Sequence, residues 1–266
     1  ETECEGMGEV MEKINLSRLK NCMARAQRGE ELTIGFLGGS ITQGSLATEH
    51  ENTYAYRVFT WWKETFPNAE FHYVNGGIGG TTSHYGVSRA VTDVLMYQPD
   101  FVVVDFSVND EPDEFFQETY EGVIRKLLQW KSEPAVVILN NVFYDTGKTA
   151  QDFHNAVGNW YQVPHVSIKD TLYQEMQQGK YTREELTPDG LHPNDKGHKL
   201  VAEKIIAFLE EVRSHMAEQE DELTIPEPMT QNAYENARRL TIREISPELA
   251  GFRADTEEKT GHLESL

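Results

Sequence analysis

Short apolar runs alternate with amphipathic segments over most of this 266-residue chain, and this alternation limits its fold more than any other feature. Five runs have the length and composition of buried strands, the last being the weakest: residues 32–37, 71–75, 101–106, 135–141 and 163–168. Helical spacing of apolar residues marks four further segments: residues 54–65, 113–131, 150–161 and 196–216. Continuous apolar runs separated by amphipathic helices are typical of a parallel sheet with helices on both faces. The pattern predicts an α/β fold with a mostly parallel five-stranded sheet.

The chain is acidic, with 24 Lys and Arg against 44 Asp and Glu and a formal net charge of −20. This balance argues against a nucleic-acid backbone or an anionic membrane as the main partner and favours a neutral ligand. No apolar run approaches the roughly 18 residues of a membrane-spanning helix. The N-terminal "ETECEGMGEVMEK" is acidic where a signal peptide is basic and then apolar. We expect a cytoplasmic protein with no membrane partner, although a signal peptide that had been removed would leave no trace.

The sequence changes in character after residue 216. Residues 1–216 hold the predicted strands and helices and form the main domain, whereas residues 217–266 contain "EQEDE", two prolines in "IPEPM" and weak alternation in "RRLTIREI". This composition predicts a linker and one or two strands, which are too few to form a core alone. Either the segment packs on the main domain or it begins a second, β-rich module. Cys4 and Cys22 could pair, but neither a disulfide scaffold nor a metal site is indicated.

Polar clusters follow the ends of the predicted strands. "GGSITQG" follows the first strand, "NGGIGGTTS" the second and "SVND" the third, while "TPDGLHP" precedes the last helix. In a parallel α/β sheet the carboxyl ends of the strands meet at one edge, where ligands bind. We therefore expect these four clusters, distant in sequence, to converge in one cleft.

Ser40 lies in the first of these clusters and has two interpretations. A serine after a glycine turn is a preferred helix N-cap, but one that faces a cleft can also serve as a nucleophile. Gly79 and Gly80 allow the backbone to approach a ligand closely, and Asn109 offers an amide donor. The Ser40 N–H, a backbone N–H of Gly79 or Gly80 and the Asn109 side chain would together form an oxyanion hole.

His192 is the best candidate for a general base, with Asp189 three residues earlier as the group that orients its imidazole. "DKGH" gives a rival pair, Asp195 and His198. We expect Asp195 to be the N-cap of the last helix, which would make the second pair a capping arrangement rather than a catalytic one. We therefore favour the pair in the loop, where Pro193 keeps the preceding backbone extended.

Other catalytic motifs fit this chain poorly. "GGSITQGS" lacks the lysine of a phosphate-binding loop, and "GGIGGT" does not give G-x-G-x-x-G. Thr42 stands where the nucleophile elbow of α/β-hydrolases has its final glycine. No histidine cluster has metal-ligand spacing, so no metal site is expected.

The four clusters together resemble the SGNH hydrolases of the GDSL superfamily, which are named for Ser, Gly, Asn and His in four sequence blocks. The blocks match Ser40, Gly80, Asn109 and the pair Asp189 and His192, and the resemblance spans residues 32–216. One departure is that glycine stands directly before Ser40, where this family usually has aspartate. A subset with "GGSIT" looks similar, and its members commonly remove acetyl groups from plant polysaccharides such as mannan or xylan.

Membership of this family implies a flavodoxin-like three-layer α/β/α fold and two-step acyl transfer through Ser40 and His192, without a cofactor. The implied partner is an acetylated oligosaccharide. Some similar esterases carry a C-terminal carbohydrate-binding β-sandwich, and residues 239–255 resemble the start of one. A lipase or thioesterase on the same triad and a non-catalytic carbohydrate-binding protein remain alternatives.

Several residues near the expected cleft could contact a sugar. Aromatic rings can stack on sugar faces, but large aromatic side chains are more often buried. Five aromatic residues are placed near the cleft: Tyr54, Phe143, Tyr144, Phe153 and Trp160. Tyr144 and Asp145 follow the fourth strand and are the preferred substrate contacts, together with Gly79 and His84 on the loop after the second strand.

Overall fold

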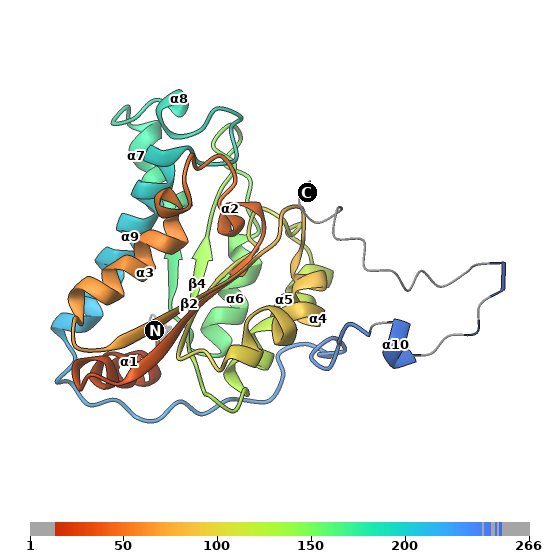
Figure 1. Cartoon of the computed structure of the whole chain (residues 1–266). Coiled ribbons are helices and arrows are strands. Elements are labelled where there is room, and N and C mark those ends of the chain that lie inside the picture. Colours follow the sequence, from red (N-terminus) through yellow and green to blue (C-terminus); the bar gives the residue numbers. More distant parts are fainter. Residues whose placement is uncertain (1–13, 241, 246–247, 249, 252–266) are drawn as a thin grey trace, which may run out of the picture.

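A parallel five-stranded sheet lies at the centre of the molecule, as predicted (Figure 1). The computed structural model describes residues 14–240, 242–245, 248 and 250–251. The strands lie in the order β2-β1-β3-β4-β5, and every neighbouring pair is parallel. Their bounds are β1 Glu31–Gly38, β2 Glu70–Gly77, β3 Phe101–Asp105, β4 Ala135–Asn140 and β5 His165–Ser167.

Helices cover both faces of the sheet and give the three layers of an α/β/α sandwich (Figure 1). One face packs against α1 (Ser17–Gln27), α3 (Tyr54–Thr65) and α9 (Asp195–Ser214). The other packs against α4 (Ser83–Asp93), α5 (Glu114–Leu128) and α6 (Gln151–Trp160). The shorter helical segments are α2 (Ser40–Gln43), η1 (His50–Asn52), η2 (Leu95–Tyr97), η3 (Lys169–Tyr173), α7 (Gln174–Gln177), α8 (Arg183–Leu186) and α10 (Ile242–Ile245).

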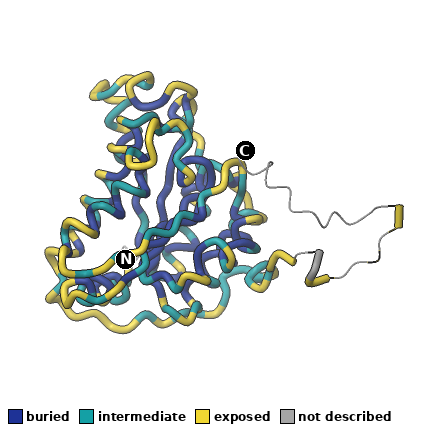
Figure 2. The backbone as a smooth tube through the Cα atoms, in the orientation of Figure 1, coloured by how far each residue is buried: buried dark blue, intermediate teal, exposed yellow. Residues whose placement is uncertain are grey.

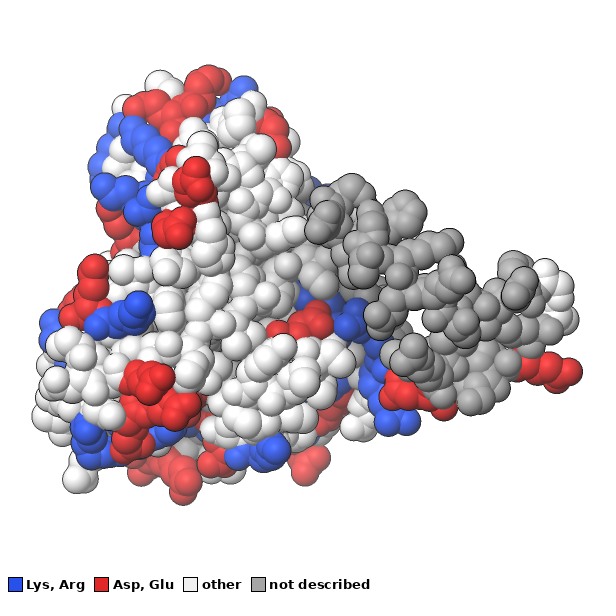
Figure 3. All heavy atoms as spheres, viewed as in Figure 1, with Lys and Arg blue, Asp and Glu red and all other residues white. Residues whose placement is uncertain are grey.

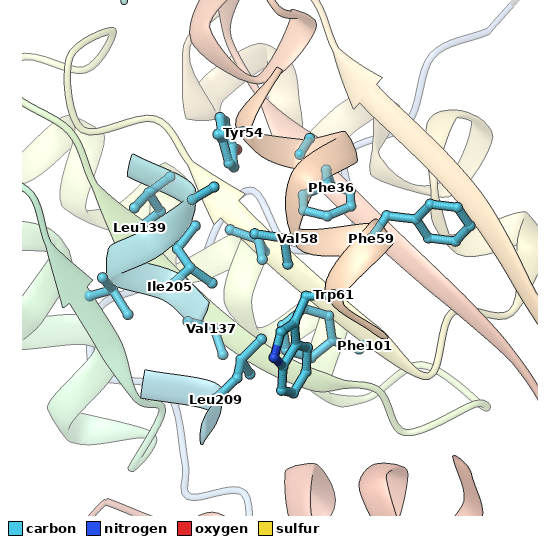
Figure 4. Packing of buried hydrophobic residues seen from close by; sticks show 14 of the residues in the cluster. Phe36, Tyr54, Val58, Phe59, Trp61, Phe101, Val137, Leu139, Ile205 and Leu209 are labelled. Atoms are coloured by element: carbon cyan, nitrogen blue, oxygen red, sulfur yellow. The ribbon is translucent and has the colours of Figure 1, made fainter. Parts of the chain in front are cut away.

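The hydrophobic core is divided by the sheet into two clusters. Every residue of β3 and β4 is buried, because both faces of these central strands are covered, and the tube of Figure 2 is dark along the sheet. Figure 4 shows the cluster on the side of α3 and α9, where Phe36 and Phe101 from the sheet pack with Val58 and Ile205 from the helices. This packing fixes the strand ends that position the site.

The last helix begins one residue earlier than predicted. Asn194, not Asp195, is the N-cap of α9, and its side chain accepts a hydrogen bond from the Gly197 N–H at 3.0 Å. The Asp195 carboxylate instead accepts from the N–H and hydroxyl of Thr48, at 2.8 and 2.6 Å. Asp195 therefore joins the loop after α2 to α9 rather than capping the helix.

Residues 217–240 pack on the main domain and run below the sheet to α4 and α5 (Figure 1). The carboxylate of the buried Glu121 on α5 accepts from the Met229 N–H and from the N–H and hydroxyl of Thr230. Arg125 on the same helix pairs with Glu235 at 3.0 Å. The expectation of strands in this region is wrong for the part that the structure describes, which forms turns, irregular backbone and the short helix α10.

Two sequence-based expectations fall largely outside the described residues. Cys22 is buried in α1, while Cys4, its possible partner, lies outside them. Within residues 239–255, the predicted start of a module, residues 241, 246–247, 249 and 252–255 are also outside. In the described part of the chain, no helix combines the length and apolar character needed to cross a membrane.

Candidate active site

The predicted nucleophile and base lie side by side at the carboxyl end of the sheet. Ser40 is the first residue of α2, directly after β1, and its Oγ lies 2.8 Å from Nε2 of His192. Only 9% of Ser40 is exposed, whereas 24% of the His192 side chain is open to solvent. The Ser40 hydroxyl is thus already hydrogen-bonded to an imidazole that is partly open to solvent.

Asp189 completes a chain of three polar groups. Its Oδ2 lies 2.7 Å from Nδ1 of His192, so a proton on Nδ1 is donated to the carboxylate. This tautomer leaves Nε2 as the acceptor that faces the Ser40 hydroxyl. The order of contacts, Ser40 to His192 to Asp189, is the one required for general-base activation of a serine.

The carboxylate of Asp189 is held firmly although 45% of its side chain is exposed. Its other oxygen, Oδ1, accepts from the N–H groups of Leu191 and His192, at 3.0 and 2.8 Å, and from the Thr187 hydroxyl at 3.1 Å. Partial burial raises the pKa of Asp189, but the hydrogen bonds from His192 and the two N–H groups outweigh it and hold this pKa well below its usual range. The group therefore stays ionised wherever His192 acts as a base.

The turn before Ser40 requires glycine for steric reasons. A Cβ on Gly39 would collide with the Asn109 side-chain amide, and a Cβ on Gly38 would collide with the Thr42 hydroxyl. Gly39, not Ser40, occupies the N-cap position of α2. The Asn109 side-chain amide consequently packs against the residue that precedes the nucleophile, and its role as an oxyanion donor stays a prediction.

The two predicted glycines after β2 differ in their surroundings. The Gly79 N–H donates to the Gln43 side-chain oxygen at 2.7 Å, so this N–H is engaged within the protein. Gly80 has a φ of +70°, which glycine tolerates readily, and a Cβ there would meet open space. The contact of Gln43 was not predicted, because its partner lies on another loop. Its position within "GGSITQG" was the only available signal.

Two predicted substrate contacts follow β4 and have different outcomes. Tyr144 is only 2% exposed and belongs to the core, so its predicted contact with substrate is wrong. Burial raises the pKa of its hydroxyl. The half-exposed Asp145 packs so closely on Gly190 that a Cβ there would collide with its carboxylate, and it pairs with Arg183 at 3.2 Å. Asp145 thus supports the loop that carries Asp189 and His192.

His84 is exposed at the start of α4, beside two other aromatic rings. Its ring centroid lies 5.3 Å from that of Phe115 and 5.4 Å from that of Tyr234. Phe115, in the first turn of α5, is 42% exposed. The contact of His84 with substrate stays a prediction.

The rival pair of Asp195 and His198 is occupied with structural contacts. His198 is fully buried, accepts from the Tyr54 N–H at 3.3 Å and lies 3.2 Å from the Ser45 carbonyl oxygen. Burial lowers the pKa of His198 to about 4. Among the described residues, no group of three or more His, Cys, Asp or Glu side chains could hold a metal ion.

An α/β sandwich with Ser, His and Asp in hydrogen-bonded order at the carboxyl end of its strands defines a serine hydrolase. Residues 36–200 match the model of the GDSL-like lipase/acylhydrolase family, and the chain belongs to this family.

Two solved structures of a two-domain esterase active on acetylated mannans are similar to this chain. One, co-crystallised with mannopentaose, is 50% identical with a TM-score of 0.81, over 85% of this chain and 60% of that one. The other is 47% identical with a TM-score of 0.89, over 95% of this chain and 69% of that one. The chain thus spans less than two thirds of the first.

More distant structures share the fold. A catalytic mutant of an acetylxylan esterase from Geobacillus stearothermophilus is 15% identical, with a TM-score of 0.58 over 69% of this chain and 96% of that one. At this identity the likeness extends to the fold alone. A search of curated proteins found no match to this chain.

Proposed function

We propose that this protein is a serine esterase that removes O-acetyl groups from mannan oligosaccharides. The observation that carries the proposal is the contact chain from Ser40 Oγ to His192 Nε2, 2.8 Å, and from His192 Nδ1 to Asp189 Oδ2, 2.7 Å. Mannan is favoured over xylan because the esterases that are 50% and 47% identical act on acetylated mannans.

The first half-reaction transfers the acetyl group to the protein. As Ser40 Oγ bonds to the ester carbonyl carbon, His192 Nε2 takes the hydroxyl proton. The carbonyl oxygen becomes negative and receives hydrogen bonds from the N–H groups of Ser40 and Gly80 and from the Asn109 amide. The bond to the sugar oxygen then breaks, and His192 returns the proton to that oxygen, so a free sugar hydroxyl leaves.

The second half-reaction repeats these roles with water. His192 Nε2 takes a proton from a water molecule while the water oxygen bonds to the carbonyl carbon of the acetyl group on Ser40. The tetrahedral species collapses, the proton passes to Ser40 Oγ, and acetic acid leaves, ionising to acetate. Asp189 keeps the imidazole in one tautomer and stabilises its cation throughout.

Substrate contacts away from the reacting ester are proposed at His84. The exposed rings of His84 and Phe115, with Tyr234 beside them, offer apolar faces on which a sugar can stack. Replacing His84 by Ala is expected to raise KM for an acetylated oligosaccharide several-fold and leave KM for nitrophenyl acetate unchanged, because only the oligosaccharide reaches these rings. Equal effects on both substrates would exclude this contact.

The direct test is product analysis on acetylated mannan and acetylated xylan side by side, with wild type and Ser40→Ala. We expect acetate from mannan at the higher rate and none above background from the variant. A parallel series of acetyl, butyryl and octanoyl nitrophenyl esters identifies the acyl group. Rates that rise with chain length would favour a lipase or thioesterase. Unchanged activity in Ser40→Ala would exclude the proposed nucleophile.

A further inference from the structure

A second Asp-His pair is buried behind the residues of the proposed oxyanion hole. His154 Nε2 lies 3.0 Å from Asp110 Oδ2, and neither side chain is exposed to solvent. A buried carboxylate is costly unless it is fully hydrogen-bonded, so a pair of this kind is expected to have a structural or functional reason. The triad does not use it, because its base is His192 and its acid is Asp189.

Asp110 joins the two loops that carry the oxyanion donors. Its Oδ1 accepts from the Ser83 N–H at 2.8 Å, and Ser83 begins α4 directly after the loop that contains Gly80. On its own loop, the N–H groups of Asn109 and Asp110 both donate to the Phe106 carbonyl oxygen at 2.9 Å. One carboxylate therefore sets the distance between the Gly80 loop and the Asn109 loop.

His154 fixes this carboxylate to the helices behind it. Its ring stacks on Tyr120 of α5, with centroids 3.6 Å apart and planes within 2° of parallel. The Ser83 hydroxyl lies 2.6 Å from that of Thr119, also on α5. Movement of Asp110 would disturb α4, α5 and α6 together, so both loops are tied to one rigid support.

We propose that Asp110 and His154 are positioning residues that hold the Gly80 N–H and the Asn109 amide in fixed relation to Ser40. This inference rests on the proposed esterase function and extends it to the buried support of the oxyanion hole. Neither residue is assigned a contact with the reacting atoms. Their effect is on the geometry of donors, which stabilise the transition state only if they already point at the oxyanion.

The kinetic test uses His154→Phe, which keeps a flat ring against Tyr120 and removes the hydrogen bond to Asp110. Loss of one oxyanion donor typically lowers kcat by about 10²–10³, so a displaced donor should lower kcat on nitrophenyl acetate by roughly 10–100-fold. KM should stay within about twofold, since the interaction is made only in the transition state. Asp110→Ala should act in the same direction and more strongly.

A double-mutant cycle separates positioning from general damage. In an Asn109→Ala background His154→Phe should cost several-fold less than in wild type, because one donor that it positions is already gone. The control is Glu121→Gln, which alters another fully buried carboxylate, on α5, that binds residues 229 and 230 instead. This control variant should have a kcat within about twofold of wild type. If His154→Phe lowered kcat by the same factor in the wild-type and Asn109→Ala backgrounds, the proposal would be overturned.

A measurement independent of activity distinguishes failure of this inference from failure of the proposed function. In a chain with ¹⁵N-labelled glycine, assigned by Gly80→Ala, the Gly80 amide resonance should move or broaden in His154→Phe and remain in place in Glu121→Gln. An unmoved Gly80 resonance would overturn the positioning role even in an active enzyme. A moved resonance in a chain without esterase activity would overturn the proposed function alone.

Discussion

At the scale of single residues, Gly39 decides whether the site can assemble. Any Cβ at this position would collide with the Asn109 amide. We expect Gly39→Ala to lower kcat/KM by at least about 10²-fold, the effect of losing one oxyanion donor. Steady-state kinetics on nitrophenyl acetate, with circular dichroism to confirm folding, checks this. Full activity in a folded Gly39→Ala variant would show that Asn109 is not required where we place it.

Asp189 provides a second prediction at this scale. Asp189→Asn removes the acceptor that selects the Nδ1 tautomer of His192, and we expect kcat to fall by about 10²–10⁴-fold with little change in KM. Asp195→Asn is the matched control, since it changes the aspartate of the other Asp-x-x-His pair, whose carboxylate binds Thr48. Kinetics on a single small ester compares the two. Equal losses would remove the assignment of Asp189 as the orienting acid.

At the scale of elements, all five strands were predicted, but the bounds of the two edge strands were not. β1, β3 and β4 appear as apolar runs because both faces of the inner sheet are covered. β2 and β5 lie at the edges of the sheet and are partly exposed, so apolar residues do not mark their ends. β2 extends beyond its apolar run, and β5 covers only residues 165–167 of the predicted strand. The helices α1 and α4 were not predicted.

The site was predicted where strand ends dictate it and missed where side chains meet across loops. Ser40, Asn109 and the loop of His192 all follow from the rule that ligands bind at the carboxyl ends of parallel strands. The Gln43 contact with the Gly79 N–H and the burial of Tyr144 depend on tertiary packing, which one-dimensional patterns do not encode. For the same reason, choosing between the adjacent capping residues Asn194 and Asp195 required the structure.

The segment after α9 gives a prediction about stability. Arg125, with a side chain only 9% exposed, donates to the Tyr161 hydroxyl at 3.1 Å and the Pro226 carbonyl oxygen at 2.8 Å and pairs with Glu235 at 3.0 Å. We expect Arg125→Ala to lower the free energy of unfolding by about 2–4 kcal/mol, because it removes three contacts of a mostly buried guanidinium, including the ion pair with Glu235. Urea denaturation measures this change.

The partners of Arg125 are Tyr161, Pro226 and Glu235, none of which is a candidate site residue, so kcat of the folded variant at 25 °C should stay near that of wild type. A loss below about 0.5 kcal/mol, the range of an ordinary surface substitution, would show that residues 226–235 contribute little to the domain.

At the scale of the whole molecule, the chain has a formal net charge of −20. On the face shown in Figure 3, however, no large region carries charges of one sign alone. The middle of this face is mostly uncharged, and acidic and basic side chains are mixed around α7 and α8. Ion pairs there include Arg183 with Asp145 and Lys196 with Glu185. A surface of this kind suits a neutral glycan, which needs hydrogen bonds and apolar contacts rather than electrostatic steering.

Two buried titratable groups near the site should give the stability of the molecule opposite dependences on pH. Burial raises the pKa of Asp105 to about 7, and its Oδ2 accepts from the Thr42 hydroxyl at 3.0 Å. The folded state therefore binds this proton more tightly than the unfolded state. The stability due to Asp105 is full below pH 4 and falls as pH rises toward 7. For His198, whose pKa burial lowers to about 4, stability is full above about pH 6.5 and falls as pH drops toward 4.

Each dependence can be isolated by a variant whose replacement side chain does not titrate. In the difference in unfolding free energy between the variant and wild type, the contributions of all other titratable groups cancel. Asp105→Asn should gain stability relative to wild type as pH rises from 4 to 7, by on the order of 2–4 kcal/mol, since wild type alone must ionise a buried acid. His198→Gln should lose stability relative to wild type over the same interval. In wild type, protonation of His198 favours the unfolded state at low pH, and this effect disappears as the pH rises, whereas the variant has no such group. Urea denaturation at half-unit pH steps measures both differences. Slopes of the same sign in the two variants would mean that at least one of these groups is solvated rather than buried in the folded protein.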